Sequence, residues 1–304
     1  MLRHFMFDVL SNMSIKTASV ILAAGKGTRM RSNIPKVLHA LAGRPLMEYA
    51  LDLGLDICSV PPIVVVGFES EKVQECIGDR AKVAYQESQL GTGHALHQTE
   101  GVLRGQADMI VVWAADMPLL SKETLQSVVN CQIENQGPIS IVTAISNNDR
   151  GFGKVIRSKF GEVQAIVEKS DATAEQLSIN ELNVGVYCFR ALWLWDALSA
   201  LKPSANGEYY LTDLIKAAYS QDEKIGVVTT NAVDEIIGIN TRVHLAEAET
   251  ALRARINNRW MERGVTLIDP ANTYIDSNVE IGLDTIVLPN THSVSYTHLR
   301  AHET

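Results

Sequence analysis

The sequence predicts an α/β protein with a doubly wound, mostly parallel sheet, followed by a linking helix and the start of a left-handed parallel β-helix. Three observations lead to this prediction. Short β-branched runs alternate with amphipathic stretches through the first half, which is typical of parallel strands buried on both faces. A helical apolar stripe then covers residues 241–263. Beyond it an aliphatic residue recurs every six positions, at Ile275, Ile281 and Val287.

The first half contains five strand-like runs with four helix-like stretches between them. The runs are Val20–Ala23, Ile63–Gly67, Val83–Tyr85, Met109–Trp113 and Ile139–Ala144. The amphipathic stretches are Leu46–Leu55, Glu71–Ile77, Ala95–Leu103 and Lys122–Cys131. Because a doubly wound sheet binds its ligands beyond the carboxyl ends of its strands, we expect the functional site at that edge.

After Gly151 the pattern predicts an α+β elaboration of the same domain. Lys154–Ser158 and Glu162–Glu168 flank a turn and read as a hairpin. Further strands are expected at Asn183–Phe189 and Ile225–Thr229, and helices at Leu192–Leu201 and Tyr209–Tyr219. Since no linker separates the two halves, residues 17–240 are predicted to form one domain, preceded by an extension at 1–16 that lacks the order of a signal peptide.

A linking helix is predicted at 241–264, and the first coils of the β-helix at 265–292. The apolar stripe of the helix is Leu245, Ala248, Leu252, Ile256 and Trp260. Gly264 is a suitable C-terminal stop. Ser293 stands where the next aliphatic residue of the repeat is due, so we expect the repeat to end there and residues 293–304 to match no part of the fold.

The composition is that of a globular, acidic protein. Of its 304 residues 46% are hydrophobic and 20% charged, and the formal net charge is −8, which argues against general nucleic-acid binding but leaves room for a local anion site. No apolar run is long enough to span a membrane. The four cysteines are scattered without a CxxC pair. We therefore expect reduced thiols and a cytoplasmic location.

A Gly-rich loop, LAAGKGTRM at 22–30, directly follows the first strand. Gly25 and Gly27 let backbone N–H groups approach phosphate oxygens, and Lys26 and Arg29 add cationic donors. Lys36 follows within a Pro-Lys pair. A turn with solvated basic residues is the plain alternative, but the strand, the glycines and the basic pairs occur together here.

Two other phosphate loops do not fit this segment. The third glycine of the G-x-G-x-x-G dinucleotide motif is replaced by Met30, which argues against a dehydrogenase, and the spacing of a Walker A loop is absent.

Eight motifs together resemble the bacterial bifunctional enzymes with N-acetylglucosamine-1-phosphate uridyltransferase and glucosamine-1-phosphate N-acetyltransferase activities. They are LAAGKGTRM at 22–30, PKVLH at 35–39, QLGTGHA at 89–95, ADMP at 115–118, GFGKV at 151–155, NVG at 183–185, GEYYLTD at 207–213 and GIN at 238–240. The resemblance covers residues 17–292. It implies a Rossmann-like, GT-A-like nucleotidyltransferase fold. It also implies a Mg²⁺-dependent reaction of UTP with N-acetylglucosamine 1-phosphate that yields UDP-N-acetylglucosamine and pyrophosphate for cell-envelope precursors.

The resemblance also implies the site residues. The uridine end would be held by Leu22, Ala23, Ala24 and Gly25, completed by Gln86, Gly91 and Thr92. The triphosphate would meet Lys26, Gly27, Arg29 and Lys36, with Arg29, Lys36 and Asp116 as the catalytic residues. Asp116 and Asn240 would be the Mg²⁺ ligands. The sugar side would comprise Gly153, Glu168 and Asn183, with Tyr209 and Tyr210 in its wall.

Several of these residues have plainer readings. Asp116 alone could cap a loop, Asn240 could be a turn amide, and Thr92 could be a helix N-cap. The chain also departs from the family pattern, chiefly on the sugar side. Ala114 and Ala115, both assigned to the substrate site, stand where Tyr and Gly are usual, and Lys154 and Val184 replace a frequent Arg and Thr.

The implied mechanism is in-line attack of the sugar-phosphate oxygen on the α-phosphorus, which needs no general base because the nucleophile is already an anion. Three alternatives stand beside it. One is a pyrophosphorylase for another pair, such as dTTP and glucose 1-phosphate. Another is a non-catalytic nucleotide-sugar-binding regulator, against which the intact Arg29, Lys36, Asp116 and Asn240 argue.

The third alternative is a hexapeptide-repeat acyltransferase. The predicted β-helix is too short for it, so acetyltransferase activity is expected to be missing from this chain. A homotrimer is expected only of a full-length form.

Overall fold

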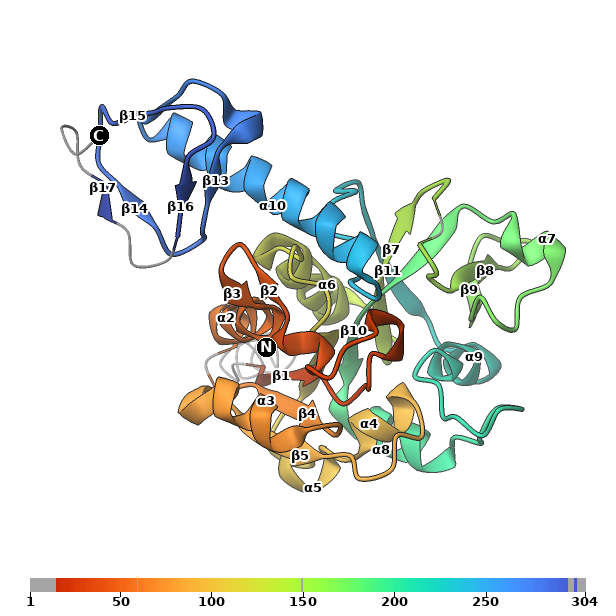
Figure 1. Ribbon diagram of the computed structural model, residues 1–304. Helices are drawn as coiled ribbons and strands as arrows, with labels where there is room; N and C mark the ends of the chain where they lie inside the picture. The colour runs from red at the N-terminus through yellow and green to blue at the C-terminus, as the bar shows by residue number, and fades with distance from the viewer. Residues whose placement is uncertain (1–14, 59, 149, 295–297, 300–304) are drawn as a thin grey trace, which may run out of the picture.

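An α/β body is joined by one long helix to a small coil of short strands (Figure 1). The computed structural model describes residues 15–58, 60–148, 150–294 and 298–299. Residues 1–14 of the predicted extension, and 295–297 and 300–304 of the predicted tail, lie outside the described residues. None of the described helices combines the length and the apolar character needed to cross a membrane.

Among the described residues the body contains a nine-stranded sheet with the order β11-β7-β10-β6-β1-β4-β5, and β8 and β9 attached beside β10. The strands are β1 (Thr17–Leu22), β4 (Ile63–Val66), β5 (Lys82–Tyr85), β6 (Met109–Ala114), β7 (Ile139–Ile145), β8 (Lys154–Arg157), β9 (Val163–Val167), β10 (Glu181–Arg190) and β11 (Ile225–Thr230). Strands β1, β4, β5 and β6 are parallel, and β11 is parallel to β7. β10 lies antiparallel between β6 and β7. The predicted mostly parallel sheet and the β8–β9 hairpin are confirmed.

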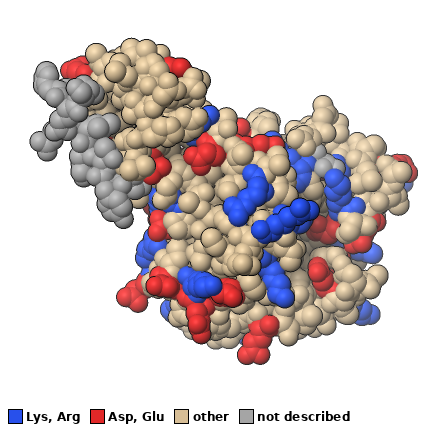
Figure 2. All heavy atoms as spheres, in the orientation of Figure 1, with Lys and Arg blue, Asp and Glu red and all other residues tan. Residues whose placement is uncertain are grey.

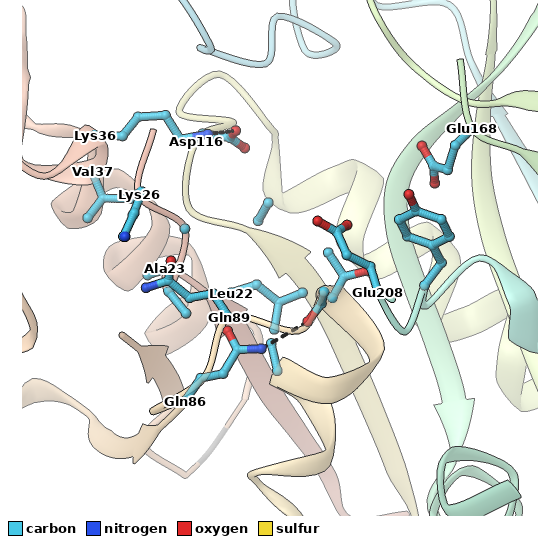
Figure 3. A pocket seen from close by; sticks show the side chains of 17 residues that line it. Leu22, Ala23, Lys26, Lys36, Val37, Gln86, Gln89, Asp116, Glu168 and Glu208 are labelled. Atoms are coloured by element: carbon cyan, nitrogen blue, oxygen red, sulfur yellow. Dashed lines mark hydrogen bonds and ion pairs between the residues drawn. The ribbon is translucent and has the colours of Figure 1, made fainter. Parts of the chain in front are cut away.

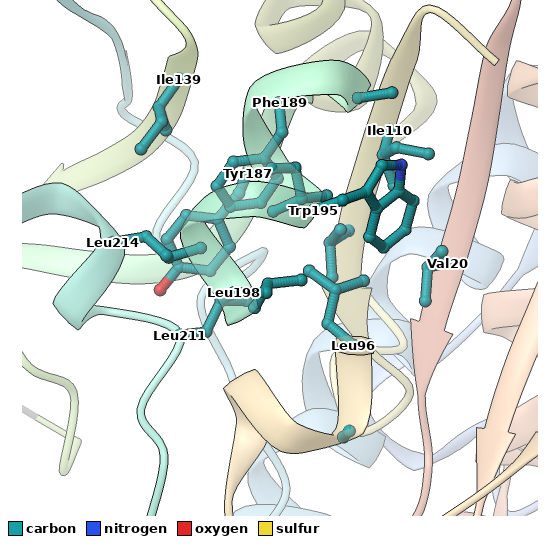
Figure 4. Close-up of a cluster of buried hydrophobic side chains, with 14 of the residues drawn as sticks. Val20, Leu96, Ile110, Ile139, Tyr187, Phe189, Trp195, Leu198, Leu211 and Leu214 are labelled. Carbon is teal, nitrogen blue, oxygen red and sulfur yellow. The ribbon is translucent and has the colours of Figure 1, made fainter. Parts of the chain in front are cut away.

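Two apolar cores cover the two faces of the sheet because successive strand residues point to opposite sides. Val20 belongs to one core and its neighbour Ile21 to the other. The first core receives α4 (Thr92–His97), α5 (Glu100–Leu103), α8 (Ala191–Ala200) and α9 (Asp213–Ser220). The second receives α2 (Leu46–Ile57), α3 (Ser70–Ile77) and α6 (Lys122–Glu134). Figure 4 shows Trp195 and Leu198 of α8 packed in the first core with Val20 and Ile110.

Two helices differ clearly from their predicted extents, one because of a local side-chain bond and the other because of a tertiary backbone bond. The stretch predicted as one helix at Ala95–Leu103 divides into α4 and α5. Buried Thr99 donates its hydroxyl hydrogen to the Leu96 carbonyl, at 2.8 Å, at the point of division. The helix predicted from Tyr209 begins only at Asp213, because the Tyr209 carbonyl, which would accept from residue 213 in a helix, accepts from the Gly93 N–H at 2.8 Å instead.

Helix α10 (Arg242–Glu262) connects the body to the coil through a single apolar stripe. Thr241 caps its start, with a hydroxyl that accepts from the His244 N–H at 3.2 Å, and Gly264 follows its end in the left-handed region with φ +86°. Ala248 packs into a small cluster of the body, whereas Ile256 and Trp260 pack into a cluster with the coil, and Leu252 contacts both. The predicted stripe is therefore divided between two cores.

The coil consists of three two-stranded parallel sheets. They pair β12 (Thr266–Leu267) with β15 (Ile286–Val287), β13 (Tyr274–Ile275) with β16 (His292–Ser293), and β14 (Glu280–Ile281) with β17 (His298–Leu299). The prediction that the repeat ends at residue 292 is wrong at Ser293, which pairs with Ile275 and is buried. Backbone pairing between turns does not require an aliphatic side chain, and the small Ser293 fits the inner position.

Replacing Ser293 with Ala should stabilise the protein by about 1 kcal/mol, because a buried hydroxyl without a partner costs free energy. No described residue bonds the Ser293 hydroxyl. The gain should appear in a urea titration followed by tryptophan fluorescence, since Trp260 lies in the cluster that covers the coil. The matched control is Thr291→Ala, which loses a 2.7 Å bond to the Leu288 carbonyl and should gain nothing. A loss of stability in Ser293→Ala would refute the assignment of the Ser293 hydroxyl as a buried group without a hydrogen-bond partner.

All four cysteines are free thiols in the structure, with Cys58 and Cys188 buried in the body. This agrees with the expectation of reduced cysteines. Burial raises the pKa of the Cys58 thiol, so this group is a poor nucleophile and packs as an apolar residue.

Candidate active site

A cavity of about 470 Å³ lies beyond the carboxyl ends of β1, β5 and β6, at the sheet edge where the sequence predicts a ligand (Figure 3). It is lined by Leu22, Ala23, Ala24, Gly25, Lys26, Lys36, Val37, Gln86, Gln89, Gly91, Thr92, Ala95, Ala114, Asp116, Glu168, Glu208 and Tyr210. Figure 2 shows basic side chains gathered in the middle of the face drawn there, on a molecule whose net charge is negative.

The loop after β1 brings Lys36 to the cavity by a close backbone approach. Gly27 adopts the left-handed region, φ +61°, and a Cβ there would lie 2.7 Å from the Cβ of Lys36. Any side chain at Gly27 would therefore displace the stem of Lys36. Met30, which replaces the third glycine of a dinucleotide motif, is 1% exposed in the cluster that α10 also contacts. It anchors the loop to the body.

Four predicted residues from distant parts of the chain meet at one end of the cavity. The Lys36 ammonium donates to Asp116 Oδ2 at 2.5 Å and to Asn240 Oδ1 at 3.2 Å. Arg29 Nη2 donates to the same Asn240 oxygen at 2.9 Å. A backbone bond from the Ile239 N–H to the Asp116 carbonyl, at 2.8 Å, places Asn240 beside the strand end. Arg29 and Lys36 are therefore paired groups rather than freely solvated loop charges.

The chemistry of this cluster fits a divalent cation. An Asp116 carboxylate oxygen and an Asn240 amide oxygen already lie within reach of a single positive group, the Lys36 ammonium. Mg²⁺ prefers oxygen ligands and takes few from the protein, leaving the others to phosphate and water. Asp116 and Asn240 are the ligand pair that the resemblance implies, and their role as Mg²⁺ ligands stays a prediction.

The loop at 90–93 is held against residues 209–211 by two backbone hydrogen bonds and one bond to a side chain. Gly91 has φ +97°, and a Cβ there would lie 2.6 Å from the Tyr209 carbonyl oxygen. The Gly93 N–H donates to that carbonyl at 2.8 Å. The Thr92 hydroxyl accepts from the Leu211 N–H at 3.0 Å. The alternative reading of Thr92 as a helix N-cap is wrong, since Gly91 precedes the helix and no side chain caps it.

Gln86 follows β5 and lines the cavity beside this loop. Its side-chain nitrogen donates to the Gly91 carbonyl at 3.0 Å and lies 3.0 Å from His94 Nδ1. The residue is buried, so its amide is held in one orientation by the protein.

The predicted sugar-side residues gather where β8, β9 and β10 meet. The Asn183 N–H donates to the Gly153 carbonyl at 2.9 Å, and a Cβ on Gly153 would lie 3.7 Å from Glu168 Oε2. Glu168 accepts from the Thr212 hydroxyl at 3.0 Å. Burial raises the pKa of the Glu168 carboxyl. The Asn183 amide nitrogen donates to the Tyr187 hydroxyl at 2.7 Å.

Most of the predicted residues line the cavity, and the others lie beside it or in the core. Gly27 and Asn240 lie against the lining residue Lys36, and Gly153 lies beside Glu168. Arg29 and Asn183 lie one contact further away, bonded to Asn240 and to Gly153. Ala115 turns its methyl group into the core and is fully buried.

The family departures at Lys154 and Val184 are also internal. Lys154 donates to the Ile179 carbonyl at 2.8 Å, and Val184 packs in the second core. Neither side chain lines the cavity.

Sequence reasoning missed some lining residues, and a signal for them existed. The residues are Val37, Gln89, Ala95 and Glu208. All four fall inside motifs that carry the family resemblance, so the full motifs predicted the lining of the cavity better than the residues singled out within them. Tyr210 lines the cavity as expected, but Tyr209 contributes through its backbone at Gly91 instead.

Comparison with known proteins agrees with this architecture. Residues 19–264 match the family model of the MobA-like NTP transferase domain. The chain is 42% identical over 280 residues to the bifunctional protein GlmU of Exiguobacterium sibiricum, covering 92% of this chain and 62% of that protein. It is 44% identical over 278 residues to GlmU of Acetivibrio thermocellus, covering 90% and 59%. The chain thus spans about three-fifths of the length of these curated relatives.

A solved structure of a UDP-glucose pyrophosphorylase complexed with UDP-glucose superposes with a TM-score of 0.60 at 19% identity. It covers 80% of this chain and all of its own. At that identity the likeness concerns the fold, and it confirms the predicted nucleotidyltransferase architecture.

Proposed function

The chain belongs to the MobA-like NTP transferase family, and from that premise we propose that it joins N-acetylglucosamine 1-phosphate to the uridylyl group of UTP, releasing pyrophosphate. The observation that carries the proposal is the meeting of Arg29, Lys36, Asp116 and Asn240 at one end of the cavity. The choice of uridine and of the N-acetylated sugar rests on the motif resemblance and on the similarity to the GlmU proteins.

The proposed reaction begins with a sugar-phosphate oxygen that is already an anion. It attacks the α-phosphorus in line with the leaving pyrophosphate, so no residue has to remove a proton. The task of the protein is to align the two substrates and to neutralise charge. Lys36 and Arg29 meet the phosphates, while Gln86 and the Gly91 loop contact the base, and Glu168 and Asn183 face the sugar.

Mg²⁺ held by Asp116 and Asn240 would neutralise negative charge on the phosphates when bound. The chain's own contribution at that place is the pair of side-chain oxygens and the backbone bond from Ile239 that sets their separation. Glu168, whose pKa is raised by burial, is suited to hydrogen bonding with sugar hydroxyls.

A pyrophosphate-release assay tests the proposal. UTP, dTTP, CTP and GTP should each be combined with N-acetylglucosamine 1-phosphate and glucose 1-phosphate, with Mg²⁺ and with EDTA. We expect the fastest release from UTP with N-acetylglucosamine 1-phosphate, and none in EDTA. Preference for dTTP with glucose 1-phosphate would assign the other pair, and absence of release from every combination would indicate a binding protein without turnover.

A further inference from the structure

The orientation of the Gln86 side chain can be read from its neighbours. The Gly91 carbonyl only accepts hydrogen bonds, so the Gln86 atom 3.0 Å from it must be the amide nitrogen. The same nitrogen lies 3.0 Å from His94 Nδ1. Both amide hydrogens are therefore used within the protein. The remaining polar atom is the carbonyl oxygen Oε1, which receives no hydrogen bond from a described residue and belongs to a side chain that lines the cavity (Figure 3).

The second bond to Gln86 sets the protonation state of His94. To accept from Gln86, Nδ1 must carry no proton, so the neutral ring carries it on Nε2. On the other side Nε2 lies 3.3 Å from the Gln98 amide nitrogen, which is identified as nitrogen because it donates to the His94 carbonyl at 3.0 Å. With Nδ1 as the acceptor, the Nε2 hydrogen has no acceptor at Gln98, so the 3.3 Å approach of these two nitrogens is a contact rather than a hydrogen bond. A charged ring would point a second N–H group at the Gln86 amide nitrogen and is disfavoured further. Burial lowers the pKa of His94, and the charge of His97 adds to the effect.

We propose that His94 is a positioning residue that holds the Gln86 carbonyl towards the nucleotide base and thereby selects bases that present a ring N–H. This inference rests on the proposed function. Uracil and thymine carry a hydrogen on ring nitrogen N3, which can donate to Oε1. Cytosine has a lone pair on N3 and would set two acceptors against each other.

Gln86 does not adapt to cytosine by rotating its amide. Rotation would place Oε1 against the Gly91 carbonyl, which can only accept, so that bond would be lost, and His94 would have to move its ring proton to Nδ1 to keep its own bond to Gln86. Both amide hydrogens of Gln86 are already bonded within the protein, so neither can bond to N3 of cytosine. Binding of cytosine would therefore leave a polar group buried and unpaired, which lowers its affinity relative to uracil. The Gly91 carbonyl fixes the direction of the Gln86 amide, and His94 adds the second bond that holds the amide in that orientation.

The test compares kcat/KM for UTP, dTTP and CTP in the wild type, His94→Leu and His94→Asn. Leu has no acceptor, whereas Asn places its oxygen at the δ position, where Nδ1 stands. In His94→Leu the preference for UTP over CTP should fall about tenfold, corresponding to one hydrogen bond, mainly through the KM for UTP. His94→Asn should keep the preference. The UTP to dTTP ratio should not change in either variant, because both bases carry the N3 hydrogen.

A double-mutant cycle separates positioning from general packing. In a Gln86→Leu background, adding His94→Leu should leave the UTP to CTP preference unchanged, since the route through Gln86 is already lost. If His94→Leu does not fold, His94→Gln replaces it, because its acceptor lies one bond further from the backbone. An unchanged preference in His94→Leu, or an equal fall in His94→Asn, would overturn the inference. A wild type without UTP turnover would instead refute the proposed function.

Discussion

Asp116→Ala should lower kcat by about three decades in the pyrophosphate-release assay. The carboxylate follows the end of β6 and supplies one of the two oxygens that accept hydrogen bonds from the Lys36 ammonium. Its removal takes away one proposed metal ligand and the strongest partner of Lys36. The backbone carbonyl of Asp116 keeps its bond from the Ile239 N–H, so the fold of the strand end should persist.

Two further variants make the Asp116 result specific. Asp116→Asn keeps an oxygen of the same reach but removes the charge, so it should lie between the wild type and Asp116→Ala and should need more Mg²⁺. Asp196→Ala is the matched control, because it removes a carboxylate whose Arg104 partner lies on the surface, and such pairs contribute little. Near-normal activity of Asp116→Ala at saturating Mg²⁺ would show that the metal site is wrongly assigned.

Arg29→Ala and Lys36→Ala should each lower kcat/KM by about two to three decades, with kcat reduced as well as affinity. Pyrophosphate gains negative charge as its bond to the α-phosphorus breaks. Cations placed there stabilise the transition state more than the bound substrate, and losing one donor of this kind costs roughly 3–4 kcal/mol. Lys36→Arg should not rescue activity fully, because its stem is confined by Gly27 and a planar fork does not replace a point charge.

A surface lysine serves as the control that distinguishes stabilisation of the leaving pyrophosphate by Arg29 and Lys36 from a general effect of removing a solvated charge. Lys72→Ala breaks only an exposed pair with Glu69 and should remain near wild-type activity. The structure argues for the difference, since Arg29 and Lys36 share the Asn240 oxygen. If both substitutions changed kcat/KM by less than twofold, the solvated reading would hold and the proposed triphosphate site would be lost.

Much of the fold and of the site could be predicted from sequence because the relevant signals are local. Buried parallel strands need apolar side chains on both faces, so the continuous apolar run at 109–114 predicts a central strand even when its neighbouring strands are not known. A glycine such as Gly27 or Gly264 marks a backbone conformation that other residues rarely adopt. The motifs then named the four residues that meet beside the cavity.

What the local pattern left open is which distant groups become partners. Periodicity shows the face of a segment but not its neighbour, so the placement of β10 antiparallel between β6 and β7 could not be read from the sequence. For the same reason the sequence did not predict that the Gly93 N–H bonds to the Tyr209 carbonyl, which shortens a predicted helix.

The amino-acid sequence by itself determined the strands, the phosphate loop, the linking helix and the identity of the proposed site residues, since each depends on residue type at short spacing. Only the tertiary structure decided that Ser293 continues the coil and that His94 lies within hydrogen-bond distance of the Gln86 amide. The physical reason is common to both. A hydrogen bond or a buried position is a property of two groups brought together by the whole fold, and neither residue carries a sign of its partner.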